Sequence, residues 1–308
     1  MRTDIEFPSG GETVRGWLFT PDEGSGPFPT VVMAGGWCYV KEIVQPRYAE
    51  MFADNGIAAI LFDYRNFGDS GGDRRQHIDP GMQIEDYRNA ISYAETLDVV
   101  DSERIGSWGL SYSGGHSLVL AAIDSRVRCA VSQIPVIDGY LNMQLANGTV
   151  NFRRLEQAIL AARRRRFETG EDTYFPHFTL DTEHEISAWP NADGYELFEG
   201  FRTSVAPNYS LDATAESVEL LMQYDVRPFT RRIIDTPTLV IVAENDDITL
   251  WDEAMRVYQS IPTAKKRLTV IDKSDHLALY SQQMLLERCA RAATEWFLER
   301  LVPLGQPA

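Results

Sequence analysis

The sequence predicts an α/β protein in which a mostly parallel sheet of eight strands carries helices on both faces and an inserted helical cap. Three observations predict this fold. Apolar runs alternate with helix-patterned segments along most of the chain, most internal runs are nearly continuous in apolar residues, and one long aromatic-rich stretch interrupts the alternation. Continuous apolar strands are typical of a parallel sheet that is buried on both faces.

Eight short segments have the composition of strands. The first two, TDIEF and TVRGWLF, flank a turn at residues 8–11 and predict an antiparallel hairpin. The parallel part of the sheet is expected from six later runs: PTVVMAGG, IAAILFDYR, RIGSWGL, RVRCAVSQIP, TPTLVIVAEND and KRLTVID.

Helices are predicted between these strands, because apolar residues recur there at helical spacing. The first candidate ends at a glycine, which is a common helix stop. The predicted helices are RYAEMFADNG, GMQIEDYRNAISYAETL, SGGHSLVLAAID, WDEAMRVYQSI and a final helix from about residue 282 to 301.

The alternation stops after the strand that ends near Ile134 and resumes near Thr238. We therefore predict a core domain at 1–137 and 236–308, with a mainly helical cap at 138–235. The cap aromatics are expected to line an apolar cavity or to pack the cap's own core: Tyr174, Phe175, Phe178, Trp189, Tyr195, Phe198 and Phe201. The arginines at 163–166 are expected to form a solvated helix face.

Composition limits the partners. The 308 residues include 29 Lys and Arg against 45 Asp and Glu, a net charge of −16. Such a chain repels phosphate backbones and anionic lipids, so we expect neither a nucleic-acid nor a membrane partner. We see no signal peptide and no apolar run near the ~20 residues of a membrane span. The three cysteines (Cys38, Cys129, Cys289) lack metal-ligand spacing, so we expect no metal, no cofactor and a cytoplasmic location.

The segment GLSYSGG at residues 109–115 joins a predicted strand to a predicted helix. A serine nucleophile at such a turn needs small residues two places before and after it. Both Ser111 and Ser113 satisfy this rule. The strand ends at Gly109, so the register favours Ser111 as the nucleophile and leaves Ser113 to cap the helix or fill the small position.

A serine hydroxyl needs a base that is oriented by an acid. His276 follows the last predicted strand, where the base of this arrangement belongs. Asp246 follows the strand TLVIVA and is the predicted acid. Asp247 is a near rival and Asp138 a distant one.

The other four histidines have weaker claims. His77 precedes the serine, and we expect His116 to be packed or solvated rather than catalytic. His177 and His184 fall in the cap, where we expect surface positions, with a contact to substrate as the alternative.

Acyl chemistry also needs donors for a developing oxyanion. We predict the backbone N–H groups of Tyr112 and Trp37, with Cys38 as the alternative to Trp37. The glycines at 35 and 36 allow the backbone to approach a substrate. Trp37, Cys38, Tyr112 and Trp189 are the predicted substrate-binding residues.

These residues together resemble the α/β-hydrolase superfamily. The resemblance covers about residues 13–138 and 236–301 and rests on MAGGWCYVKE, FDYRNFGDSGG, RIGSWGLSYSGGH, VIVAEND and SDHLALY. It is strongest to dienelactone-hydrolase-like enzymes, bacterial esterases and polyketide thiohydrolase-like proteins. Ser111, Asp246 and His276 match the family nucleophile, acid and base, while Asp63 and Arg65 match a structural turn. Homodimers are common on this scaffold, and we carry one as an expectation from that analogy.

The resemblance implies a serine hydrolase that cleaves a hydrophobic ester or lactone, with a hydrophobic small molecule as its substrate. Thioesters and amides suit the same chemistry, although no cluster for binding a free peptide terminus is evident. Two alternatives stay open. One is hydrolysis of a C–C bond in a β-diketone-type substrate by the same triad, and the other is a ligand-binding protein without turnover.

Overall fold

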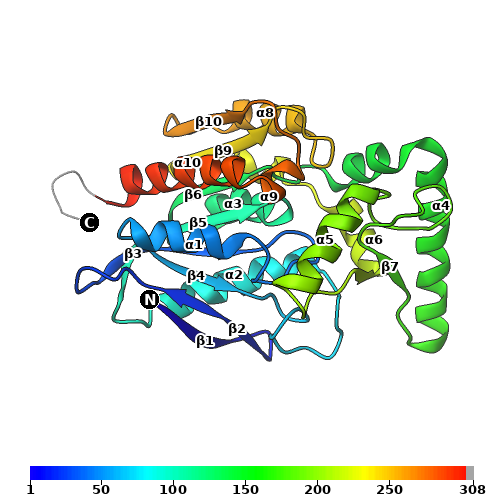
Figure 1. Cartoon of the computed structure of the whole chain (residues 1–308), viewed down its shortest axis with the longest axis horizontal. Coiled ribbons are helices and arrows are strands. Elements are labelled where there is room, and N and C mark those ends of the chain that lie inside the picture. The colour runs from blue at the N-terminus through cyan, green and yellow to red at the C-terminus, as the bar shows by residue number, and fades with distance from the viewer. Residues whose placement is uncertain (303–308) are drawn as a thin grey trace.

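A single eight-stranded sheet organises the protein (Figure 1). The computed structural model describes residues 1–302. The strand order is β1-β2-β4-β3-β5-β6-β9-β10. The strands are β1 Arg2–Ser9, β2 Glu12–Phe19, β3 Phe28–Ala34, β4 Ala58–Phe62, β5 Val100–Leu110, β6 Val127–Gln133, β9 Thr238–Ala243 and β10 Lys266–Ile271.

The sheet is mixed in the manner predicted. β1 pairs antiparallel with β2, and β2 pairs antiparallel with β4, so the N-terminal hairpin is confirmed. From β4 to β10 every neighbouring pair is parallel. The central strands β3, β4 and β9 are buried at every residue, because helices cover both faces of the sheet.

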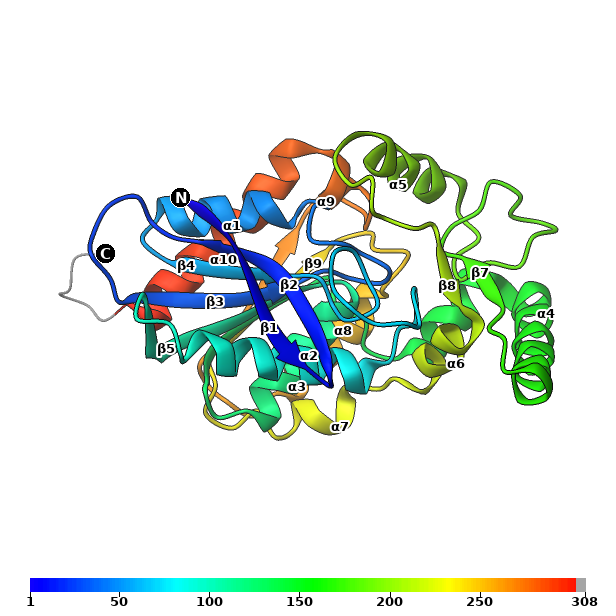
Figure 2. The same cartoon turned by 90° about the horizontal axis from the view of Figure 1, so that it is seen from below.

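Helices lie on both sides of the sheet, which confirms the predicted fold class. α1 packs with α10 on one face, and α2 packs with α3 on the other (Figures 1 and 2). The helices of the core are α1 Gln45–Asp54, α2 Pro80–Ala94, α3 Tyr112–Ile123, α8 Trp251–Ser260, α9 Ala278–Ser281 and α10 Gln283–Leu301. None of the helices among residues 1–302 is long and apolar enough to cross a membrane.

Residues 138–235, here called the cap segment, connect β6 to β9 and lie mainly at one end of the sheet (Figures 1 and 2). The segment is largely helical but also contains a small antiparallel sheet, β7 with β8, that the sequence did not predict. Its elements are α4 Gly139–Thr169, β7 Tyr174–Pro176, α5 Ala192–Ser204, β8 Asp212–Thr214, α6 Ala215–Gln223 and α7 Arg227–Thr230. Treating it as a separate domain stays a prediction.

The cap aromatics pack against one another and against the core. The Phe198 ring lies 5.2 Å from Phe178 and 5.0 Å from Tyr39, centroid to centroid. His177 joins this cluster: it is buried, and its Nδ1 lies 2.8 Å from the Tyr209 hydroxyl. The expected surface position of His177 is therefore wrong, because its aromatic neighbours draw the ring into the interior. Of the predicted aromatics, Tyr174 is exposed.

Candidate functional site

Ser111 occupies the turn between β5 and α3. Its φ is 60° and its ψ is −117°, a strained conformation for a residue with a Cβ. The turn is tight, since a Cβ on Gly109 would lie 1.9 Å from the carbonyl oxygen of Ser113. Such a turn raises the serine side chain above the end of the strand, as the predicted elbow requires.

Ser113 has a different environment. Its side chain is fully buried and accepts a hydrogen bond from the Leu110 N–H at 2.8 Å. Its hydroxyl lies 2.8 Å from the Ala34 carbonyl and 3.0 Å from that of Leu110, and donates to one of them at a time. These bonds tie the start of α3 to the ends of β3 and β5. The Ser113 hydroxyl is thus used in hydrogen bonds to the backbone, which suits a structural role rather than that of the nucleophile.

His276 and Asp246 form a buried pair. The His276 Nδ1 lies 3.0 Å from Oδ2 and 3.1 Å from Oδ1 of Asp246. The carboxylate also accepts from the N–H groups of Ile248 and Thr249 and from the Thr249 hydroxyl. Burial works to raise the pKa of Asp246, but the facing His276 and these donors outweigh burial and hold its pKa below the ordinary value. An ionised Asp246 fixes the ring with Nδ1 as donor and Nε2 as acceptor.

The rival carboxylates lie elsewhere. Asp247 lies at the surface, where the partial desolvation of its carboxyl group raises its pKa. Asp138 caps α4 by accepting from the Leu141 N–H and pairs with Arg227 at 2.7 Å. Neither makes a hydrogen bond to His276 among the described residues.

Tyr280 is a site residue that the sequence did not reveal. Its hydroxyl lies 3.2 Å from the His276 Nε2, one helical turn along the chain. Burial raises the pKa of the Tyr280 phenol, although hydrogen bonds from Tyr39 and Ser111 partly oppose that shift. The base is therefore held from both ring nitrogens, by Asp246 at one and by Tyr280 at the other.

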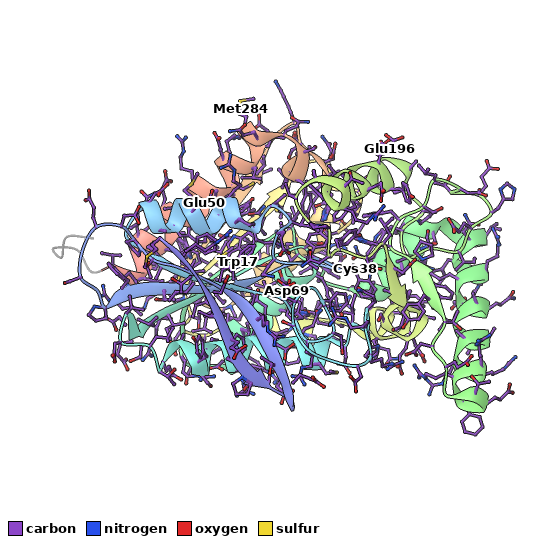
Figure 3. All side chains as sticks on the ribbon, turned by 60° about the horizontal axis from the view of Figure 1, so that its bottom comes forward. Trp17, Cys38, Glu50, Asp69, Glu196 and Met284 are labelled. Atoms are coloured by element: carbon purple, nitrogen blue, oxygen red, sulfur yellow. The ribbon has the colours of Figure 1, made fainter. Side chains whose placement is uncertain are left out.

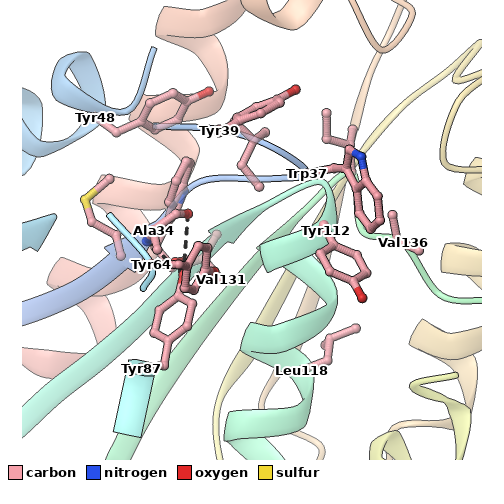
Figure 4. Close-up of a cluster of buried hydrophobic side chains, with 14 of the residues drawn as sticks. Ala34, Trp37, Tyr39, Tyr48, Tyr64, Tyr87, Tyr112, Leu118, Val131 and Val136 are labelled. Carbon is pink, nitrogen blue, oxygen red and sulfur yellow. Dashed lines mark hydrogen bonds between the residues drawn. The ribbon is translucent and has the colours of Figure 1, made fainter. Parts of the chain in front are cut away.

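The loop after β3 lies against the nucleophile. A Cβ on Gly36 would come within 3.1 Å of both the Leu110 carbonyl oxygen and the Ser111 Cβ. The adjacent Trp37 packs edge-on against Tyr112, with ring centroids 5.4 Å apart (Figure 4). Trp189 of the cap segment also packs edge-on against Trp37, with ring centroids 5.7 Å apart. The structure thus brings three of the four predicted substrate-binding side chains together at the start of α3.

Cys38, the fourth, follows in the same loop with a φ of 62°. Burial raises the pKa of its thiol, and the nearby Asp212 raises it further. A thiol with a raised pKa is a poor nucleophile, so Cys38 serves here as a buried packing residue.

The remaining histidines make hydrogen bonds to side chains outside the Asp246–His276 pair. His116 is buried, and its ring nitrogens lie 2.9 Å from the Tyr224 hydroxyl and 2.9 Å from Gln83 Oε1. His77 lies 3.0 Å from the Thr214 hydroxyl, and His184 is exposed as expected. No group of three or more His, Cys, Asp or Glu within residues 1–302 has an arrangement that would hold a metal ion.

The turn after β4 braces the site, as predicted for Asp63 and Arg65. Asp63 accepts from the backbone and the ammonium of Lys41, at 2.7 Å and 2.8 Å, which fixes the loop that contains Trp37. Arg65 pairs with the buried Asp86 at 2.7 Å.

Residues 11–278 match the family described as X-Pro dipeptidyl-peptidase (S15 family). The chain belongs to the S15 family. Together with the α/β-hydrolase structures that resemble the chain, this match confirms the superfamily that the sequence indicated. Among the relatives of this S15 chain, Thiohydrolase aneE of Aspergillus aculeatus is 30% identical over 89% of the chain and 86% of its own length.

Solved structures agree on the fold of this S15 protein. DcsB, in a complex with its substrate analogue, superposes with a TM-score of 0.84 at 26% identity and covers 98% of this chain and 100% of its own. The alpha/beta hydrolase GrgF from a Penicillium species gives a TM-score of 0.81 at 22% identity, with 98% and 100% coverage. At that identity GrgF supports the fold alone. The chain is a hydrolase of the α/β-hydrolase type.

Proposed function

We propose that this protein is a serine hydrolase that cleaves a hydrophobic carboxylic ester or lactone through Ser111, His276 and Asp246. The observation that carries the proposal is the buried Asp246–His276 pair, 3.0 Å apart, together with Ser111 at a strained strand-to-helix turn. The Tyr280 hydroxyl lies 3.2 Å from the His276 Nε2 and is also a hydrogen-bonding neighbour of Ser111. A buried carboxylate that orients an imidazole is the arrangement that activates a serine hydroxyl.

The proposed reaction proceeds in two halves. The Ser111 Oγ attacks the substrate carbonyl carbon while its proton passes to the His276 Nε2. Collapse of the tetrahedral intermediate breaks the bond to the leaving oxygen, which takes the proton from Nε2, and leaves an acyl group on Ser111. Water then attacks the acyl group by the same route and releases the acid. Asp246 stays ionised and stabilises the imidazolium.

Two backbone N–H groups are proposed to hold the oxyanion. The Tyr112 N–H is the first of α3, and such groups have no acceptor within their own helix. The Trp37 N–H follows Gly36, where the backbone runs so close to Ser111 that an added Cβ would lie 3.1 Å from the Ser111 Cβ. Donors at both places would stabilise the charge that develops on the carbonyl oxygen.

The surroundings favour a substrate that combines apolar surface with oxygen acceptors. Among residues 1–302, the indole N–H groups of Trp37 and Trp189 and the Tyr112 hydroxyl are buried without a protein partner. Buried donors without a partner are costly, so a ligand that supplies oxygens to them would gain binding energy. A lactone, or an ester with further carbonyl groups, supplies both apolar surface and such oxygens.

A thioester is the second candidate, and the similarity to Thiohydrolase aneE favours it. The same acyl-enzyme would form with a thiolate rather than an alkoxide as the leaving group. Parallel assays with matched oxygen and sulfur esters of one acyl group separate the two candidates by their kcat/KM.

Labelling by a fluorophosphonate probe, read by intact mass, tests the proposal. Wild type should take up one label, Ser111→Ala none, and Ser113→Ala one. Turnover of lactones and β-diketones on the same samples then distinguishes ester or lactone hydrolysis from C–C bond hydrolysis. A folded wild type that takes no label and turns over no ester would refute the proposal and favour a ligand-binding protein.

A further inference from the structure

A groove of about 620 Å³ lies beside the candidate site. Its walls come from β2, from α1, from the end of α5 in the cap segment, and from α10. Figure 3 labels Trp17 and Glu50, two residues that line it. The apolar part of the lining includes Trp17, Val44, Met51, Phe201, Val205 and Leu286.

The charge of the groove favours an uncharged occupant. Two arginines line it, Arg2 and Arg47, and Arg47 is paired with Glu50 at 3.3 Å. Four acidic residues also line it: Glu42, Glu50, Asp54 and Glu287. This acidic excess would repel a carboxylate or a phosphate, whereas the apolar walls suit an alkyl chain.

Tyr280 connects the groove to the site. It lines the groove, and its hydroxyl lies 3.2 Å from the His276 Nε2. Its ring packs edge-on against Tyr39, with ring centroids 5.7 Å apart. Tyr280 is thus the residue that links the groove to the base His276.

The Tyr280 hydroxyl also makes a hydrogen bond to His276 Nε2, the nitrogen that must accept the serine proton. A neutral imidazole with Nδ1 as donor has one lone pair, on Nε2. The Tyr280 hydroxyl takes that lone pair in this structure, so Tyr280 must move before His276 can accept the Ser111 proton. Because Tyr280 also lines the groove, its displacement would expose the His276 Nε2 to the groove.

The position of the groove relative to His276 indicates which part of the substrate it would bind. Nε2 is the atom that returns the proton to the leaving oxygen, so the leaving group must pass next to it. The groove begins at the residue bonded to this nitrogen. We propose that the groove binds an uncharged, mainly apolar leaving group, an alcohol or thiol with an extended chain. In this proposal the Tyr280 side chain separates the groove from the base and moves aside when the leaving group binds. The proposal rests on the hydrolase mechanism above.

Two isomeric esters test it, because octyl acetate and ethyl octanoate differ only in which side of the ester is long. Val205→Trp fills the groove from the end of α5, and Val150→Trp is the matched control on an exposed face of α4. We expect Val205→Trp to lower kcat/KM for octyl acetate about tenfold relative to ethyl octanoate, the effect of excluding roughly two methylene groups. Val150→Trp should leave the ratio at its wild-type value.

A fall that is equal for both esters, or larger for ethyl octanoate, would overturn the proposal. Titration with 1-octanol provides a readout that does not need turnover. Wild type and Val150→Trp should bind the alcohol, and Val205→Trp should bind it about tenfold more weakly. If octanol binding follows this pattern but the wild-type protein takes no fluorophosphonate label, the hydrolase mechanism is refuted. The groove then remains a binding site for an apolar alcohol. Equal binding by all three proteins would overturn the groove assignment.

Discussion

Replacement of Ser113 by alanine separates the two serines of the turn. The Ser113 hydroxyl accepts from the Leu110 N–H at 2.8 Å and donates to a backbone carbonyl of Ala34 or Leu110. Alanine removes both bonds at once and leaves a buried N–H and a buried carbonyl without their partner. At about 1 kcal/mol for each lost hydrogen bond, with a further penalty for the groups left unpaired, the free energy of unfolding should fall by roughly 2–4 kcal/mol.

Ser111→Ala is the matched control. Within residues 1–302, no backbone group makes a hydrogen bond to the Ser111 hydroxyl, and alanine meets the same strain at a φ of 60°. Its free energy of unfolding should stay within about 0.5 kcal/mol of wild type. Urea unfolding measures both variants, and fluorophosphonate labelling on the same samples measures the nucleophile.

The expected pattern is crossed: Ser113→Ala is destabilised but labelled, and Ser111→Ala is stable but unlabelled. Two results would refute the reasoning. Loss of the label in folded Ser113→Ala together with its survival in Ser111→Ala would move the nucleophile by two residues. A Ser113→Ala protein as stable as wild type would show that the hydroxyl does not tie the helix to the strands.

Three further predictions follow from the same geometry. Asp246→Asn should lower kcat by roughly 10³–10⁴-fold, as expected when the orienting acid is lost, whereas Asp247→Asn should keep most of the activity; steady-state turnover of p-nitrophenyl butyrate decides, and equal losses would contradict the assignment. Gly109→Ala should cost at least about 3 kcal/mol in unfolding free energy, since its Cβ would lie 1.9 Å from a backbone oxygen, whereas Gly200→Ala on an open face of α5 should be neutral or add up to ~1 kcal/mol; thermal or urea unfolding measures both. Burial lowers the pKa of His116 from 6.5 to about 3, so the unfolded chain binds a proton that the folded chain refuses, and stability present above pH 6.5 is lost as the pH falls toward 3. His116→Gln should flatten the fall in unfolding free energy by about 1.4 kcal/mol per pH unit in that range, and an unchanged slope would show that His116 is not the buried neutral group.

Local patterns were enough for most of the sheet. The apolar runs of β3, β4 and β9 mark strands buried on both faces, and they appear as such. The spacing of Gly109, Ser111 and Ser113 located the turn, because only small residues fit it. The strand register already favoured Ser111. The structure adds that the Ser113 hydroxyl is bonded to backbone groups, one of which, the Ala34 carbonyl, lies in β3, far away in sequence.

Long-range packing explains what the sequence did not reveal. Nothing in the sequence marks Tyr280 among 13 tyrosines, because its role depends on where α9 places it relative to the His276 ring. His177 follows Pro176 and precedes Phe178 in the sequence. Its burial was still not evident, because Phe198 and Tyr209, which also enclose it, come from later elements. The strand β7 contains three residues and has no period to detect, and it forms because β8 pairs with it.

The insertion of the cap segment has a consequence for synthesis of the chain. β6 ends at Gln133, and its partner strand β9 begins only at Thr238. At roughly 5–20 residues per second, a ribosome needs about 5–20 s to make the intervening segment. During that interval one edge of β6 carries backbone groups that β9 will later pair, in the middle of what becomes a continuous sheet. An open edge of this kind invites pairing with other nascent chains. Cells that make this protein must keep that edge covered until the last quarter of the chain, which begins near Thr238, has been made.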